Sequence, residues 1–118
     1  KCGYPQTPTA HPGPRAFVSG QVAWRPDGSP APASLAEQTA IVIENLKGAL
    51  AALQATTDDI AQMRIYRTDL RDETQEIAMG AILGFLNGAQ PSLTGIGVAA
   101  LAGPDLQIEV EMVVQVAA

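Results

Sequence analysis

The stretch from Leu106 to Val116 constrains the fold of this chain most, because its sequence, LQIEVEMVVQV, alternates apolar and polar side chains almost without a break. A period of two predicts a β-strand, since successive side chains on a strand point to opposite faces of the sheet. The apolar side chains on one face are Leu106, Ile108, Val110, Met112, Val114 and Val116. A sheet that contains this strand must bury one face against another layer of the molecule.

Two segments upstream carry clear signals of their own. Residues 15–24, RAFVSGQVAW, are rich in strand-forming side chains and predict a strand that is interrupted near Ser19 and Gly20. Residues 34–55 predict a helix, because Ser34 and Glu37 form a capping box and the large aliphatic residues that follow recur at helical spacing.

Three more segments complete the pattern. Residues 60–70 predict a strand with Met63 and Ile65 on one face and Arg64 and Tyr66 on the other. Asp72 can cap a second helix, which NGAQP ends, and residues 91–101, PSLTGIGVAAL, predict a further strand. The order β, α, β, α, β, β predicts an α+β fold of two layers, in which one mixed β-sheet carries both helices on one face.

The composition sets the class of protein. The 118 residues fit one domain, predicted to span 15–118 behind a Pro- and Gly-rich N-terminal arm, 1–14. Hydrophobic residues make up 47% of the chain and charged residues only 16%, which favours an oligomer. The net charge of -5 argues against nucleic acid as a partner. The acidic runs lack histidines and regular ligand spacing, so the sequence predicts no metal and no cofactor.

The expected location is the cytoplasm. Cys2 is the only cysteine, which suits a reducing compartment, and no apolar run is long enough to cross a membrane. No signal-peptide pattern is present either.

The second face of the predicted sheet raises the question of a binding site. The last strand contributes Gln107, Glu109, Glu111, Val113 and Gln115 to it. The strand before it is expected to add Leu93, Gly95, Gly97 and Ala99. This mixture is too apolar for a solvent face and too polar for a core, so we expect a subunit interface whose glycines admit a neighbouring backbone or a ligand.

Several stretches together resemble one family. They are VSGQV, EQTAIVIENLKGALAAL, DDIAQMRIYRTDLRD, QPSLTGIGVAAL and LQIEVEMVVQVA, which occur in that order between Phe17 and Ala117. The chain is similar to the Rid proteins, also called YjgF or endoribonuclease L-PSP-like proteins. The resemblance implies a chorismate-mutase-like fold and a homotrimer with three small-molecule clefts between subunits. Its best-known members hydrolyse reactive enamines and imines such as 2-aminoacrylate.

The resemblance also implies roles for individual residues. Glu109 matches the glutamate that positions the attacking water, and Ser19 and Gly20 match a pair that contributes backbone groups to the cleft. The family motif Pro-x-Arg-Ser/Thr falls on PSLT, so Leu93 stands where deaminating members carry the arginine that clamps the substrate carboxylate. A family asparagine falls near Ile77, and a family aromatic residue could correspond to Tyr4.

These residues leave alternatives open. Glu109 either manages water or is a structural carboxylate across the interface, and Arg64, beside Tyr66, either supplies the missing positive charge or forms a salt bridge. The substrate-binding candidates are Ser19, Gly20, Leu93, Gly95, Arg64 and Tyr66. The function is then a hydrolase for an imine, enamine or related small molecule other than 2-aminoacrylate, or a non-catalytic ligand-binding or regulatory trimer. The ribonuclease activity in the family's older name is disfavoured by the acidic charge.

Overall fold

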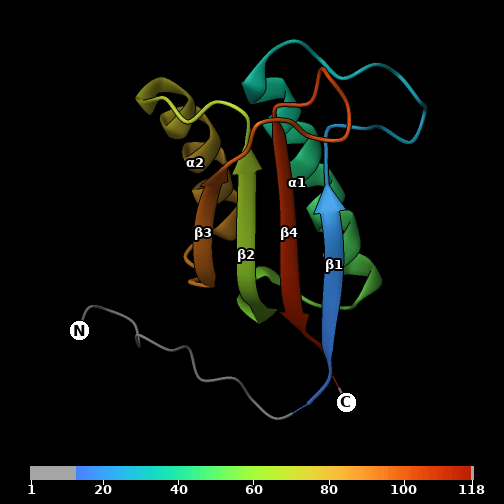
Figure 1. The fold of residues 1–118 in the computed structure, drawn as a ribbon. Coiled ribbons are helices and arrows are strands. Elements are labelled where there is room, and N and C mark those ends of the chain that lie inside the picture. The colour runs from blue at the N-terminus through green and yellow to red at the C-terminus, as the bar shows by residue number, and fades with distance from the viewer. Residues whose placement is uncertain (1–12, 118) are drawn as a thin grey trace.

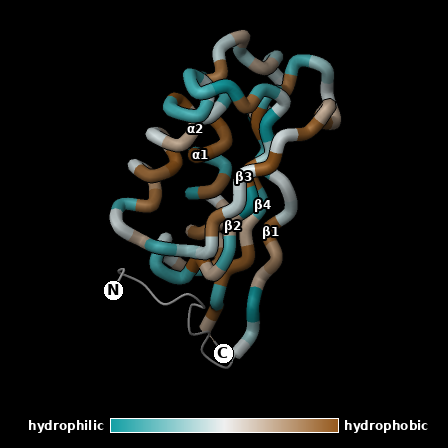
Figure 2. The backbone as a smooth tube through the Cα atoms, turned by 60° about the vertical axis from the view of Figure 1, so that its left-hand side comes forward, coloured by the Kyte–Doolittle hydropathy of each residue, from teal (hydrophilic) through white to brown (hydrophobic). Residues whose placement is uncertain are grey.

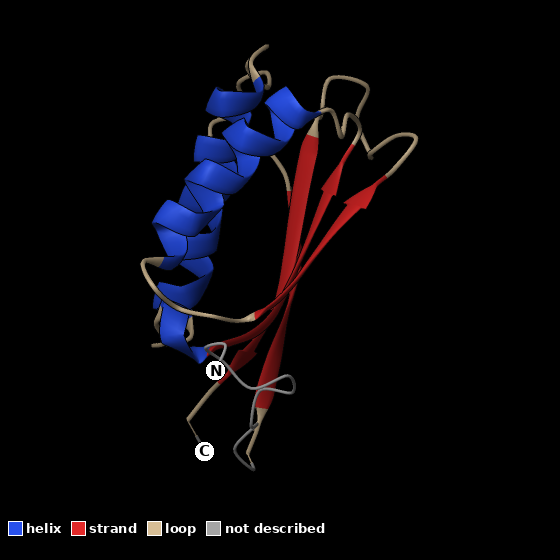
Figure 3. Cartoon of the chain, turned by 90° about the vertical axis from the view of Figure 1, so that its left-hand side faces the viewer, coloured by secondary structure: helices blue, strands red, loops and turns tan. Residues whose placement is uncertain are grey.

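Four strands form one sheet, and two helices cover one of its faces (Figures 1 and 3). The computed structural model describes residues 13–117. The elements are β1 (Arg15–Gln21), α1 (Leu35–Ala52), a short 3-10 helix (Thr57–Asp59), β2 (Ile60–Arg67), α2 (Asp72–Leu86), β3 (Ser92–Gly97) and β4 (Ile108–Gln115). The predicted two-layer α+β architecture is confirmed. The expected third strand, 91–101, is shorter than predicted because it ends at Gly97.

The sheet is mixed, with the strand order β1-β4-β2-β3. The central strand β4 pairs antiparallel with both β1 and β2, and β2 pairs parallel with β3. Helix α2 makes the connection between the two parallel strands, as such a crossover requires. The two edges of the sheet are therefore β1 and β3.

The alternation in the last strand places the core. Ile108, Val110, Met112 and Val114 are buried, and they pack with residues from both helices, including Leu46 and Ile82. Along the helices, the tube in Figure 2 changes repeatedly between hydrophobic and hydrophilic colours, as burial of one side requires. The apolar face predicted for residues 106–116 is the face that meets the helices.

Helix α1 begins at the N-cap that its sequence predicts, but the Glu37 carboxylate bonds the Ser34 hydroxyl instead of completing a capping box with the Ser34 backbone. Ser34 is the N-cap, and its hydroxyl oxygen accepts a hydrogen bond from the Glu37 backbone N–H at 3.1 Å. The Ser34 hydroxyl in turn donates to the Glu37 carboxylate at 3.0 Å. The cap satisfies one of the free backbone donors at the start of the helix.

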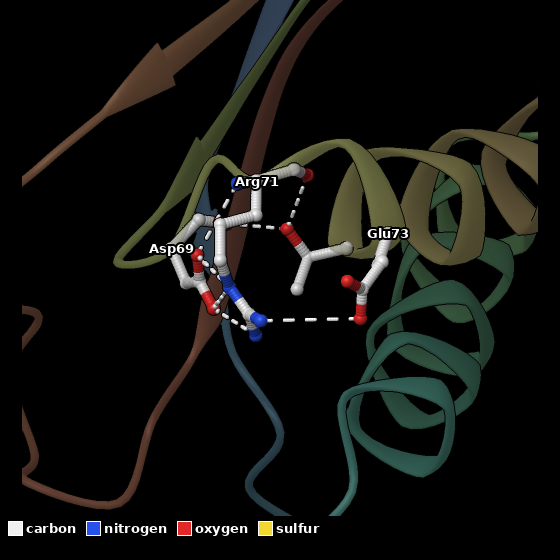
Figure 4. A network of polar contacts seen from close by, with 4 residues as sticks. Asp69, Arg71 and Glu73 are labelled. Carbon is white, nitrogen blue, oxygen red and sulfur yellow. Dashed lines mark hydrogen bonds and ion pairs between the residues drawn. The ribbon is translucent and has the colours of Figure 1, made fainter.

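Helix α2 begins differently from the prediction. Asp72 was expected to cap it, but Asp72 is the first helical residue and Arg71 is the N-cap, without a side-chain cap bond. Asp69 organises the turn instead, accepting from the Arg71 backbone at 3.2 Å and from the Arg71 Nε at 2.9 Å (Figure 4). The Thr74 hydroxyl adds bonds to the carbonyls of Asp69 and Arg71. The Asp69 carboxylate therefore orders the turn before α2, and no side chain caps the helix at Arg71.

Replacing Leu46 with alanine should lower the free energy of unfolding by about 2–5 kcal/mol, because the side chain is fully buried between α1 and the sheet and its loss leaves a cavity. Urea denaturation followed by circular dichroism measures the change. Leu83→Ala is the matched control, since Leu83 is 55% exposed on α2 and its loss should stay within about 0.5 kcal/mol. Equal effects of the two substitutions would contradict the assigned core.

Most of the predicted N-terminal arm, 1–14, lies outside the described residues, and so do Cys2, Tyr4 and His11. Where the description begins, the Val116 backbone N–H donates to the Pro14 carbonyl at 3.1 Å. Among residues 13–117, no helix is long and apolar enough to span a membrane. The same residues bring together no group of three His, Cys, Asp or Glu side chains that could hold a metal ion.

Candidate functional site

One face of the sheet is left uncovered by the helices of the chain (Figure 3). The strand register shows which side chains share this face, because Cα partners in neighbouring strands point to the same side. We call it the open face and define it by Phe17, Arg64, Tyr66, Thr94, Ile96, Glu109, Glu111 and Val113. The prediction that Arg64 and Tyr66 lie opposite Met63 and Ile65 is confirmed.

A polar cluster occupies the middle of the open face. The Tyr66 hydroxyl donates a hydrogen bond to Glu111 Oε1, and Arg64 Nη1 lies 3.5 Å from the same oxygen. Both donors come from β2 and the acceptor from β4, where Arg64 and Glu111 are direct Cα partners. Arg64 is therefore paired with a carboxylate within its own chain, which is the salt-bridge alternative raised by the sequence.

The bond to Glu111 raises the pKa of Tyr66, because loss of the phenol proton would place a second negative charge beside the carboxylate. Desolvation also raises the pKa of Tyr66, whereas Arg64 lowers it. The phenol is thus held as a neutral donor.

We expect Tyr66 to titrate above the ordinary tyrosine pKa of 10.0, and Glu111→Gln to bring its pKa back toward that value. Because the folded pKa is raised, the stabilisation from this bond is present below the ordinary pKa and is lost as pH rises through the folded pKa. Ultraviolet absorbance of tyrosinate against pH measures the titration, and Tyr66→Phe identifies which of the two tyrosines is responsible. An unchanged titration in Glu111→Gln would contradict the pairing.

Glu109 lies against the backbone of Gly20. A Cβ atom built on Gly20 would fall 2.6 Å from the Glu109 Cδ and closer still to Oε2, so only glycine leaves room for the carboxylate. The strand irregularity predicted near Ser19 and Gly20 is confirmed, since the pairing of β1 with β4 shifts register between Val18 and Gln21. This irregularity brings the Gly20 backbone to the acid. Glu109 and Gly20 thus form one local unit.

A hollow with a volume of about 330 Å³ adjoins the polar cluster. Its lining includes Phe17, Ser19, Gln62, Arg64 and Glu111, from β1, β2 and β4. Phe17 is 81% exposed, which is a high value for a large aromatic residue. Phe17 and Gln62 were missed by sequence reasoning, although the spacing of Phe17 and Ser19, two residues apart on one strand, could have found Phe17.

Leu93 and Gly95 do not lie on the open face, and the prediction that they share a face with Glu109 is wrong. In the parallel pairing of β2 with β3, Leu93 is the partner of Met63, and Gly95 is the partner of Ile65. Met63 and Ile65 are buried core residues. Leu93 packs against the hydrophobic core on the helix side. Gly95 is exposed at the sheet edge, and a Cβ built on it would meet nothing within 4 Å.

The comparisons with known proteins agree with this fold. The family model described as Endoribonuclease L-PSP matches residues 3–116, which is most of the chain. The chain belongs to this family, the Rid proteins. It is 37% identical over 94 residues to the RutC family protein YjgH of Escherichia coli, covering 80% of this chain and 71% of that protein. It is 28% identical over 95 residues to the mitochondrial protein MMF1 of Saccharomyces cerevisiae, covering 80% of this chain and 64% of that one.

Solved structures of Rid proteins are similar in fold. The protein YyfB from Yersinia pestis, described as a Rid protein of unknown function, superimposes with a TM-score of 0.81 at 34% identity. The match covers 88% of this chain and 80% of that one. A structure of the protein YJGH gives a TM-score of 0.78 at 31% identity, covering 90% of this chain and 79% of its own.

Within this Rid fold, the predicted site residues fall into two groups. Glu109, Gly20 and Tyr66 belong to the open face or its margin, whereas Leu93 and Gly95 belong to the helix side of the edge strand β3. Ser19 and Arg64 join the first group as lining of the hollow. Ile77, near the family's asparagine position, is exposed on α2. One chain alone does not bring the two groups together.

Proposed function

We propose that this Rid protein is a cytoplasmic homotrimer whose subunits share small-molecule clefts. Support comes from the separation of the predicted site residues onto opposite faces of the sheet. A cleft that contains both groups of predicted site residues, those of the open face and those of β3, forms only where the open face of one subunit meets the β3 edge of its neighbour. The exposed Phe17 on the open face supports the same arrangement, because a subunit placed there would bury it.

We infer that the cleft acts as a hydrolase for small imines or enamines, with Glu109 positioning the water. Two acids lie on the open face, Glu109 and Glu111. Within residues 13–117, the hydrogen bonds from Arg64 and Tyr66 go to Glu111, which leaves the Glu109 carboxylate for a ligand. A carboxylate held against the Gly20 backbone can accept a proton from water as it adds to the imine carbon, and can return a proton to the departing nitrogen. The products are a carbonyl compound and ammonia.

The substrate class follows from Leu93, and this observation carries the proposal. Leu93 packs against the core and offers no donor, so this cleft lacks the arginine clamp that deaminating relatives use for the substrate carboxylate. Arg64 does not replace it, because Glu111 already pairs with it. We therefore expect an uncharged imine or enamine, and little hydrolysis of 2-aminoacrylate. A ligand-binding trimer without catalysis would use the same cleft.

The experiment compares two kinds of imine that differ in one carboxylate. An amine oxidase generates an uncharged imine in situ and an amino-acid oxidase generates a 2-imino acid, and ammonia release above the spontaneous rate is measured for each. Acceleration of the first that disappears in Glu109→Gln supports the hydrolase. Saturable binding of the aldehyde product without acceleration would favour the ligand-binding trimer, and strong acceleration of the 2-imino acid would contradict the assigned substrate class.

Light scattering coupled to size exclusion should report three times the chain mass of 12.3 kDa. Phe17→Asp should shift the protein toward monomers, because it places a charge on the surface that the neighbour covers. Trp24→Asp is a control that changes another exposed aromatic residue, one outside the open face. A stable wild-type monomer would remove the basis for shared clefts.

A further inference from the structure

The largest fully buried side chain of the described residues is a charged one, Arg67, which is 1% exposed. It is the last residue of β2 and lies on the helix side of the sheet, in the row of Met63 and Ile65. Its strand partners are Gly97 of β3 and the buried Ile108 of β4. A guanidinium remains protonated at neutral pH, so its charge needs compensation wherever it is buried.

The chain gives Arg67 very little compensation. Arg67 Nη2 donates to the Gln75 side-chain oxygen, which is neutral, and Nη1 has no hydrogen-bond partner within residues 13–117. Burial lowers the pKa of Arg67, and the Asp69 carboxylate nearby offsets part of this effect without a hydrogen bond to it. A buried donor without a partner is a costly feature, and natural folds retain few of them.

The nearby carboxylates pair with another arginine, Arg71. Both Asp69 oxygens accept from Arg71, whose Nη2 lies 2.7 Å from Oδ2, and Glu73 lies 3.9 Å from the other end of the same guanidinium (Figure 4). Arg71 is mostly exposed to water, so it needs acidic partners less than the buried Arg67 does. The buried cation has a neutral partner, while the exposed one has two acids.

A small ligand group at the sheet edge reaches Arg67 only when two side chains there move aside, Leu70 beside Gly97 and Gln75 on α2. Gly97, its partner on β3, has no side chain, and the Leu70 side chain fills the position where a Cβ on Gly97 would lie. Gln75 is an exposed residue on the first turn of α2, so rotation of its side chain frees Nη2 beside Nη1. The positive end of the α2 dipole lies at the same place.

We propose that Arg67 is the base of a binding site for a small carboxylate at the junction of β2, β3 and the first turn of α2. Nη1 and Nη2 present two parallel donors, which suit the two oxygens of a carboxylate. The site is separate from the Glu109 carboxylate and does not depend on the proposed hydrolase, because Arg67 faces the helix layer. Its carboxylate is either a free small molecule or an acidic side chain of a neighbouring subunit, and we commit to the free molecule.

Sodium acetate is the probe, and sodium chloride at the same ionic strength is the reference. We expect acetate to raise the melting temperature saturably by about 4 °C or more. In Arg67→Met, which keeps the volume and removes the charge, the acetate response should vanish. Arg71→Gln is the matched control, since it removes the exposed arginine of the same turn and should keep the response.

A measurement on the wild-type protein covers the case in which Arg67→Met fails to fold. The side-chain N–H resonances of a buried arginine are observable by NMR, and those of Arg67 should shift on titration with acetate while those of Arg71 do not. Absence of both the thermal response and the NMR shift overturns the proposal. An acidic side chain of a second subunit as the occupant would appear as a loss of assembly in Arg67→Met with no effect of acetate, which also overturns it.

Discussion

Gly20→Ala is expected to fold normally and to lose the proposed imine hydrolysis, by about 10²–10⁴-fold in kcat/KM, as for removal of a positioned acid or base. The added Cβ would collide with the Glu109 carboxylate, and because that group is the end of a flexible side chain, it will move rather than unfold the strand. The substitution changes no charge and no titratable group. Its effect would therefore report the position of Glu109 alone.

The measurement is ammonia release from the amine-derived imine, with Glu109→Gln and the double variant beside Gly20→Ala. Two residues that act as one unit should show no further loss in the double variant. Gly48→Ala is the matched control, since a Cβ there meets nothing within 4 Å on the exposed side of α1. Full activity in Gly20→Ala would show that Glu109 does not act from the position seen here.

Leu93→Arg should introduce carboxylate binding, with an affinity for small ketoacids about 10–100-fold above that of the wild type. Leu93 is half-buried on β3, and the adjacent edge at Gly95 has open space through which a long side chain can bring its guanidinium out of the core. The substitution should cost about 1–3 kcal/mol of stability, because it disturbs packing against Met63 and its neighbours.

Calorimetric titration with pyruvate measures the gain. Leu83→Arg is the control for a general effect of added charge, because Leu83 is exposed on α2 and the substituted protein should bind no ketoacid there. If Leu93→Arg binds no better than this control, the β3 edge does not take part in the cleft. A gain confined to Leu93→Arg would support both the proposed shared cleft and the proposed substrate class.

The elements whose signals are local could be predicted from the sequence. The alternation at 106–116 predicted the buried face of β4, and the Ser34 cap predicted the start of α1 within one residue. Asp72 was misassigned because Asp69, three residues earlier, forms the turn that begins α2, and both are acids in plausible positions. Helix starts in acidic segments have several candidates for one role.

The placement of Leu93 and Gly95 could not be predicted. Alternation shows which residues of a strand share a face but not which face meets the helices, and one residue of register exchanges them. Residues 92–97 contain two glycines and no long apolar face, so nothing in the segment orients it. The parallel pairing with β2 decides which face of β3 meets the helices, and that pairing depends on the whole fold.

Arg67 is an instructive case, because its burial could have been predicted. It stands in period with Met63 and Ile65, and the same alternation that assigned those two residues to the core assigns Arg67 there. Its charge and its place near the end of a strand favoured a solvated surface instead. The pattern of the strand was the better guide to its position.

The strand order has a consequence for how the chain reaches its native state. The last strand of the described chain, β4, lies between β1 and β2, so until it arrives β1 has no neighbour in the sheet. The pairing of β1 with β4 joins residues nearly a whole chain apart, and contacts of such long sequence separation slow folding. During synthesis β1 therefore stays unpaired in the sheet until β4 has been made.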